Sequence, residues 1–276
     1  MVKFLGIGDN TIDIYYDQGI QFPGGNAVNV TVLSSKLGAN ASYLGCISTD
    51  FFGNIIKDAL IAEGIEISHS RFCDEPNSWS RIRHIEGDRS FDGSYENEKI
   101  DYGLTCKDYD YISKFDIVHT SVYSFLEDDL NKISGSAKLL SFDFSDCNDA
   151  KYIGQISGLI DIAFISDPTS NDEECRLRAQ MIKEQGPSMV VVTRGKNGVL
   201  AYDGNQFYNQ DIVETTVVDT LGAGDGFIAA FLSSWVISKE IEAALFQGVV
   251  YAAKVCTYKG GFGYGTEIQE SQPGLV

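Results

Sequence analysis

The sequence is short of basic residues. It has 21 Lys and Arg against 39 Asp and Glu, which gives a formal net charge of −18 at pH 7. Because Lys and Arg neutralise the phosphates of nucleic acids, this deficit argues against a nucleic-acid partner. The same charge would weakly repel a free nucleotide, but salt screens such repulsion within about 8–10 Å and bound Mg²⁺ reduces it further. A small-molecule enzyme, even one that uses a nucleotide, is therefore still open.

The sequence also lacks long apolar runs and closely paired cysteines. No window approaches about 18 uninterrupted apolar residues, so no membrane span or membrane partner is expected. The apolar start, residues 2–8, is too short for the apolar part of a signal peptide and runs directly into Asp9. The six cysteines include no Cys-x-x-Cys pair, which predicts isolated thiols, no zinc site and a cytoplasmic location. They are Cys46, Cys73, Cys106, Cys147, Cys175 and Cys256.

Short apolar runs alternate with helical patterns along most of the chain. Continuous apolar runs of this length are typical of buried parallel strands, and helices between them imply right-handed crossovers. We therefore expect a single α/β domain over residues 1–276, with a doubly wound, mainly parallel sheet flanked by helices. The expected strands are residues 2–8, 41–47, 116–120, 139–143, 161–166 and 189–193, and the expected helices are residues 25–37, 51–63, 171–185, 224–236 and 240–257.

Two segments depart from that alternation. Residues 14–22 and 78–95 alternate between apolar and polar side chains, as half-exposed antiparallel strands do. No helix separates their strands, so they predict a small β-sheet at one edge of the domain, inserted at about residues 14–23 and 76–100. Residues 198–208 indicate a further hairpin, with Asp203 and Gly204 at its turn.

Residues 219–225 read Asp-Thr-Leu-Gly-Ala-Gly-Asp and carry the strongest chemical signal. An apolar, β-like run over 212–218 leads into them, and a helical pattern follows. The first N–H groups of a helix have no partner within it and attract an anion, so Gly222, Ala223 and Gly224 would form an anion hole. Asp225 beside it could accept a proton from an attacking hydroxyl, as phosphoryl transfer requires.

Simpler interpretations of this loop exist. Glycine-rich turns between a strand and a helix are common, and aspartate is ordinary near a helix start. The loop is neither a Walker A motif, because no Gly-Lys-Ser/Thr follows, nor a dinucleotide loop, because its third glycine is absent.

Two segments near the N-terminus strengthen the catalytic interpretation. Residues 24–29 read Gly-Gly-Asn-Ala-Val-Asn at the start of a predicted helix, and residues 45–53 read Gly-Cys-Ile-Ser-Thr-Asp-Phe-Phe-Gly. With an acidic strand end at 8–13 and the loop at 219–225, the chain resembles the ribokinase-like (PfkB) sugar kinases over residues 4–260. Residues 8–13, 24–30, 142–146 and 252–254 look most like the branch that phosphorylates the 6-hydroxyl of fructoselysine.

The resemblance implies an ATP-dependent sugar kinase whose small sheet is a lid over the sugar and a surface for a homodimer. It implies ATP with Mg²⁺ and leaves a monovalent cation open. The residues that it implies for the sugar are Asp9, Asp13, Gly24, Gly25 and Asn29. Those that it implies for the nucleotide are Thr193, Arg194, Gly195, Gly198, Thr220 and Gly260.

One family motif is out of register. The family carries Asn-x-x-Glu after the strand that matches 161–166, whereas this chain has Ser-Asp-Pro-Thr at 166–169. Asn171 and Glu174 follow a few residues later, but there they are typical of a helix N-cap with acidic residues in its first turn. The metal ligands are therefore left unassigned.

The substrate is the least determined feature. Arg81, Arg83 and Arg89 lie on the alternating lid segment, and from one face they could clamp the carboxylate of an amino-acid arm. His119 ends a strand beneath the expected sugar site, where a packed core histidine is the commoner role. Alternatives that the sequence leaves open are a kinase for another ketose, a keto-deoxy sugar acid or a nucleoside, and a non-catalytic sugar-binding regulator.

Overall fold

The computed structural model describes residues 1–85, 88–97, 100–269 and 272–274, with the side chains of 84–91 outside that description. Its main sheet has eight strands in the order β14-β13-β12-β11-β10-β9-β1-β4. Neighbours are parallel except β12–β13 and β13–β14, which are antiparallel. The strands are β1 (Lys3–Ile7), β4 (Asn40–Leu44), β9 (Ile117–Ser121), β10 (Leu140–Asp143), β11 (Ile162–Ser166), β12 (Met189–Thr193), β13 (Val199–Tyr202) and β14 (Phe207–Gln210).

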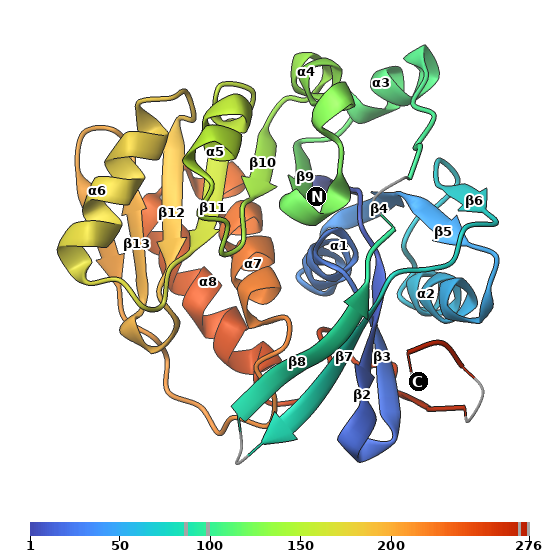
Figure 1. Cartoon of the computed structure of the whole chain (residues 1–276). Helices are drawn as coiled ribbons and strands as arrows, with labels where there is room; N and C mark the ends of the chain where they lie inside the picture. The colour runs from blue at the N-terminus through green and yellow to red at the C-terminus, as the bar shows by residue number, and fades with distance from the viewer. Residues whose placement is uncertain (86–87, 98–99, 270–271, 275–276) are drawn as a thin grey trace.

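Helices cover both faces of this sheet (Figure 1). Side chains alternate between the faces of a strand, so Phe164 packs in one core and Ala163 and Ile165 in the other. One face carries α1 (Asn26–Lys36), α2 (Phe51–Ala62), α7 (Ala223–Ser238) and α8 (Ile241–Val255), and the other carries α3 (Cys106–Ile112), α4 (Glu127–Ser136), α5 (Ala150–Ser157) and α6 (Asp172–Lys183). None of the helices in the described residues is long and apolar enough to cross a bilayer. The predicted α/β fold class is confirmed.

A second sheet projects from the main one (Figure 1). Its order is β15-β3-β2-β7-β8. It begins at Thr11, earlier than predicted, because the chain turns out of the main sheet directly after β1. We call this sheet the lid; it comprises β2 (Thr11–Tyr15), β3 (Ile20–Gly24), β7 (Trp79–Ile85), β8 (Asp88–Tyr95) and β15 (Thr266–Glu267), with the 3-10 turn η1 (Tyr16–Gln18) between β2 and β3.

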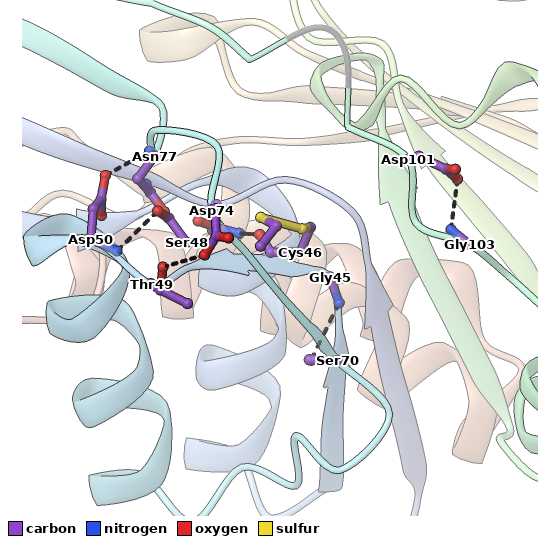
Figure 2. Close-up of a disulfide and its surroundings, with 12 residues drawn as sticks. Gly45, Cys46, Ser48, Thr49, Asp50, Ser70, Asp74, Asn77, Asp101 and Gly103 are labelled. Atoms are coloured by element: carbon purple, nitrogen blue, oxygen red, sulfur yellow. Dashed lines mark hydrogen bonds between the residues drawn. A yellow bond between two sulfur atoms is a disulfide. The ribbon is translucent and has the colours of Figure 1, made fainter.

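A third, two-stranded sheet of β5 (Cys46–Ser48) and β6 (Arg71–Cys73) lies beside the lid connection (Figure 2). Cys46 and Cys73 form a disulfide across it. The expectation of six isolated thiols was wrong for this pair, because the pairing of β5 with β6 brings together two cysteines that are 27 residues apart in the sequence. The cysteine pattern therefore no longer supports the inference of a reducing compartment.

Polar contacts around the disulfide hold the entry to the lid. Asp50 caps α2 through the Gly53 N–H at 2.8 Å and also accepts the Asn77 N–H at 2.9 Å, just before β7. Thr49 donates to Asp74 at 3.1 Å (Figure 2). These bonds join the start of a core helix to the segment that leads into the lid.

Another prediction that was wrong is the strand over residues 212–218. The segment has no strand, and its apolar side chains are exposed, including Ile212, Val217 and Val218. In the described chain no strand pairs with this segment, and β14 remains the terminal strand of the sheet. The other predicted strands and helices are present, as is the hairpin of β13 and β14.

Candidate active site

A cavity of about 620 Å³ opens where the carboxyl ends of the parallel strands meet the lid. In open α/β sheets ligands bind at this edge. The main sheet contributes Asp143 from the end of β10 and Thr193 from the end of β12, and the lid contributes Asp13 and Ser80. The first turns of α1 and α7 complete the wall.

The start of α7 has the geometry of an anion site. Gly222 has φ 75°, and a Cβ there would lie 2.6 Å from the Gly261 Cα, so this position requires glycine. A Cβ on Gly224, in contrast, would meet no atom within 4 Å. Gly222 and Gly224 both line the cavity, so the unpaired N–H groups of a 16-residue helix begin beside open space.

Asp225 lies in the first turn of α7 and points to α1. It accepts hydrogen bonds from Asn26 Nδ2 at 2.8 Å and from Asn29 Nδ2 at 2.7 Å. Burial, together with the charges of Asp143 and Asp9, raises the pKa of Asp225 to about 8, against the hydrogen bonds from the two amides, which lower it. A carboxylate poised near neutral pH beside an anion site suits a general base.

Asp9 lines the cavity just after the end of β1, but its carboxylate is already engaged by the protein. Its carboxylate accepts the N–H groups of Asn26 at 2.7 Å and Ala27 at 3.2 Å, and the hydroxyls of Ser121 and Ser124 at 3.0 Å each. Burial still raises its pKa. Asp9 therefore lines the cavity but uses its oxygens to hold the N-terminus of α1, as favoured by the helix dipole.

Asp13 and the two glycines of β3 and α1 form a tight unit. Asp13 is buried, lines the cavity and pairs with Ser80 across β2 and β7. A Cβ on Gly24 would lie 2.2 Å from the Asp13 Oδ2, and one on Gly25, where φ is 101°, would lie 2.7 Å from the Asn10 Cα. The two glycines thus let the chain pack closely against the Asp13 side chain and the Asn10 backbone, and Asp13 lies where the lid meets the cavity.

The residues predicted for the nucleotide are only partly brought together. Thr193 and Thr220 line the cavity, whereas Gly195, Gly198 and Gly260 are absent from its described lining. Arg194 donates to Asp172 Oδ1 at 2.6 Å and is likewise not part of that lining.

Glu174, which belongs to the Asn-x-x-Glu sequence that is out of register, is absent from the described lining of the cavity. Asn171 and Glu174 form a capping box at the start of α6, with bonds of 3.0 and 2.9 Å between side chain and backbone. Ser166, which stands in register with the family's Asn, does line the cavity. Within the described part of the chain no group of three His, Cys, Asp or Glu side chains is arranged to hold a metal ion.

The predicted arginine clamp was wrong for Arg81 and Arg83. Arg81 donates to the Asp92 carbonyl at 2.6 Å, and Arg83 pairs with the Asp92 carboxylate at 2.9 Å. Both guanidinium groups lie over the Tyr16 ring. Because Ser80 takes the cavity side of β7, its neighbour Arg81 points to the other face. The side chain of Arg89, in β8, lies outside the described residues.

Several site residues escaped sequence reasoning. Asn26 bonds to both Asp225 and Asp143, and burial raises the pKa of Asp143 to about 6. Asp219 is buried and accepts the N–H groups of Leu221 and Gly260, each at 2.9 Å, and the hydroxyl of Tyr15 in the lid. Asn26 and Asp219 lie within the two glycine motifs, so the sequence marked their positions. It did not reveal their roles, because their partners are distant in sequence.

Comparison with known proteins agrees with this geometry. The model of the pfkB family carbohydrate kinases matches residues 12–263. The chain is 37% identical to the fructosamine kinase FrlD of Bacillus subtilis over 268 residues, covering 96% of this chain and 94% of that protein. It is 36% identical to the fructoselysine 6-kinase of Escherichia coli, covering 95% and 100%.

Solved structures show the same fold. The ribokinase of Arabidopsis thaliana, complexed with ribose and ATP, has a TM-score of 0.79 at 20% identity and 94% coverage of both chains. A putative ribokinase II from E. coli, in complex with ATP and Mg²⁺, has a TM-score of 0.76 at 23% identity and 95% coverage of both. With the family match spanning most of its length, the chain belongs to the pfkB family of carbohydrate kinases, which are phosphotransferases.

Proposed function

We propose that this kinase transfers the γ-phosphoryl group of ATP to the 6-hydroxyl of fructoselysine or a closely related fructosamine. The names of the two relatives at 36–37% identity support this choice of substrate. The feature of this chain that carries it is the charge of the cavity.

The described lining of the cavity is acidic throughout. It contains no Lys or Arg and six carboxyl groups, those of Asp9, Asp13, Glu96, Asp143, Asp146 and Asp225. A fructosamine carries a protonated secondary amine next to carbon 1, which gains attraction in such a cavity. The carboxylate of a keto-deoxy sugar acid would find no cationic partner among these residues and would have to shed its water. The charge therefore favours an aminated sugar.

The proposed transfer uses Asp225 as the base. Asp225 accepts the hydroxyl proton as the sugar oxygen forms its bond to the γ-phosphorus and the bond from that phosphorus to the ADP oxygen breaks. The N–H groups at the start of α7, beside Gly222 and Gly224, lie where they can hold the charge on the transferring group. Mg²⁺ bound with the nucleotide would neutralise phosphate charge, which suits a cavity so rich in carboxylates.

The test is a side-by-side measurement of kcat/KM with MgATP. The sugars are fructoselysine, other fructose–amino-acid adducts, fructose, ribose and 2-keto-3-deoxygluconate. A matched control is fructoselysine acetylated on the secondary amine, which keeps the arm and loses the charge. We expect the aminated sugars to lead and the acetylated control to fall towards fructose. If an unsubstituted sugar or the sugar acid gives the highest kcat/KM, the substrate assignment fails while the kinase assignment stands.

A further inference from the structure

The amide of Asn26 is held on every side. Its Nδ2 donates to Asp143 Oδ2 at 2.9 Å and to Asp225 Oδ1 at 2.8 Å. Its Oδ1 lies 2.9 Å from Nε2 of His119, and Nδ1 of His119 lies 2.9 Å from the Ser141 hydroxyl. A continuous row of hydrogen bonds therefore runs from the middle of the sheet to the proposed base.

Chemistry fixes the direction of each bond in this row. In the ionised state that a general base requires, the carboxylates of Asp143 and Asp225 can only accept, so the NH₂ group of Asn26 must face them. The amide oxygen then faces His119, and because that oxygen is an acceptor, Nε2 of His119 must carry the hydrogen. The hydroxyl of Ser141 is left to donate to Nδ1; its other acceptor, the Val118 carbonyl, is farther away at 3.3 Å.

The setting of His119 restricts it to one state. It is fully buried in β9, between β1 and β10, and burial lowers its pKa to about 3. The imidazole is therefore neutral over the working pH range and donates one hydrogen bond only. His119 is not part of the described cavity lining, so its connection to the reacting groups runs through Asn26.

We propose that His119 is a positioning residue for phosphoryl transfer, which holds the Asn26 amide in the orientation that aims and ionises Asp225. Without the Nε2–H donor the amide of Asn26 can turn over and present its oxygen to two carboxylates. Asp225 would then lose one of its two donors, and its proton would be held more tightly. The proposal rests on Asp225 as the base and does not depend on which sugar is used.

Two substitutions of His119 distinguish the effect of its hydrogen-bond donor from the effect of its ring packing. His119→Phe keeps an aromatic ring and removes both nitrogens, whereas His119→Gln places an amide nitrogen near the position of Nε2. We expect His119→Phe to lower kcat by about 10- to 100-fold, as is usual for removing an outer hydrogen-bond partner, with little change in the KM of the sugar. The acid limb of its kcat profile should move to higher pH, and His119→Gln should recover most of both changes.

Phe4→Leu is the control for a merely structural effect. Phe4 lies on β1 beside His119, with ring centroids 6.5 Å apart, and is equally buried. Its truncation should lower the melting temperature and leave the pH profile unchanged. A folded His119→Phe enzyme with the wild-type pH profile, or a Phe4→Leu enzyme that shifts it equally, would overturn the proposal.

A readout that needs no turnover distinguishes this proposal from the proposed function. The pKa of Asp225, followed by carboxyl carbon NMR and assigned with Asp225→Asn, should rise in His119→Phe and return in His119→Gln. An unchanged pKa of Asp225 contradicts the positioning role. If that pKa shifts as expected but no sugar is phosphorylated, the positioning role holds and the substrate proposal fails.

Discussion

The carboxylate of Asp225 accepts hydrogen bonds from two asparagine side chains and lies at the N-terminus of α7. We expect Asp225→Asn to lower kcat by roughly 10²- to 10⁴-fold, because general base catalysis contributes that much. Nucleotide affinity, measured by calorimetry, should be nearly unchanged because the anion site is left in place. Turnover close to that of the wild type would show that another group takes the proton.

The raised pKa of Asp225 also links stability to pH. A carboxyl whose pKa rises on folding contributes stability that is complete below its unfolded pKa of about 3.9 and is lost as pH rises through about 8. Asn cannot ionise, so the melting temperature of Asp225→Asn should gain on that of the wild type as pH rises from about 5 to about 9. A constant difference over that range would contradict the raised pKa.

The hydrogen bond from Asn26 to Asp225 joins residues that are 199 positions apart, and no local pattern in the sequence predicts such a pair.

Gly222 and Gly224, at the start of α7, differ in why glycine is needed. Gly224 has room for a Cβ within the protein, whereas Gly222 does not. We expect Gly224→Ala to fold with a near wild-type melting temperature and to lose about 10²- to 10³-fold in kcat, because its methyl group enters the space kept for the phosphoryl group. Gly222→Ala is the contrast and should lose stability first, because its backbone conformation disfavours a side chain. Full activity in Gly224→Ala would place the phosphoryl group elsewhere.

The lid contributes Asp13 to the cavity from the opposite side to α7. Asp13→Ala should raise the KM of the sugar and leave the KM of MgATP unchanged, since Asp13 comes from the lid whereas Thr193, proposed for the nucleotide, ends a strand of the main sheet. Ser80, which pairs with Asp13 in the neighbouring strand, offers a control, because Ser80→Ala removes a smaller polar group from the same floor. A selective rise in the KM of MgATP would mean that the two halves of the site are reversed.

Helices and strands were predictable from the sequence where the spacing of the apolar residues matches the face that is buried. The parallel strands are continuous apolar runs that are buried on both faces, and Gly25 and Gly222 have positive φ angles that favour glycine. The run at 212–218 is interrupted by Glu214, Thr215 and Thr216, and it is exposed and forms no strand. Alternation on β7 correctly placed Arg81 and Arg83 on one face, but which face they share depends on how β7 pairs with β2. The pairing of β7 with β8 also has an irregularity between Ser80 and Ile82.

At the scale of the whole molecule the net charge of −18 acts on both substrates. A field of this sign repels the anionic MgATP complex and attracts an aminated sugar, and salt weakens both effects over a Debye length of about 10 Å at 0.1 M. The net charge is a property of composition that the sequence alone predicts, whereas the potential at the cavity depends on where the fold places the charged side chains.

The two substrates should therefore respond to salt in opposite directions. As ionic strength rises from low to physiological values, we expect kcat/KM to rise for MgATP and to fall for fructoselysine, each by about threefold. Acetylated fructoselysine, which lacks the charge on its secondary amine, should show a weaker fall, and neutral fructose almost none. Parallel responses for MgATP and fructoselysine would mean that salt acts on the protein's conformation and not on the approach of charged substrates. Opposite responses would tie the acidity of the chain to its choice of an aminated sugar, since a sugar acid would follow MgATP.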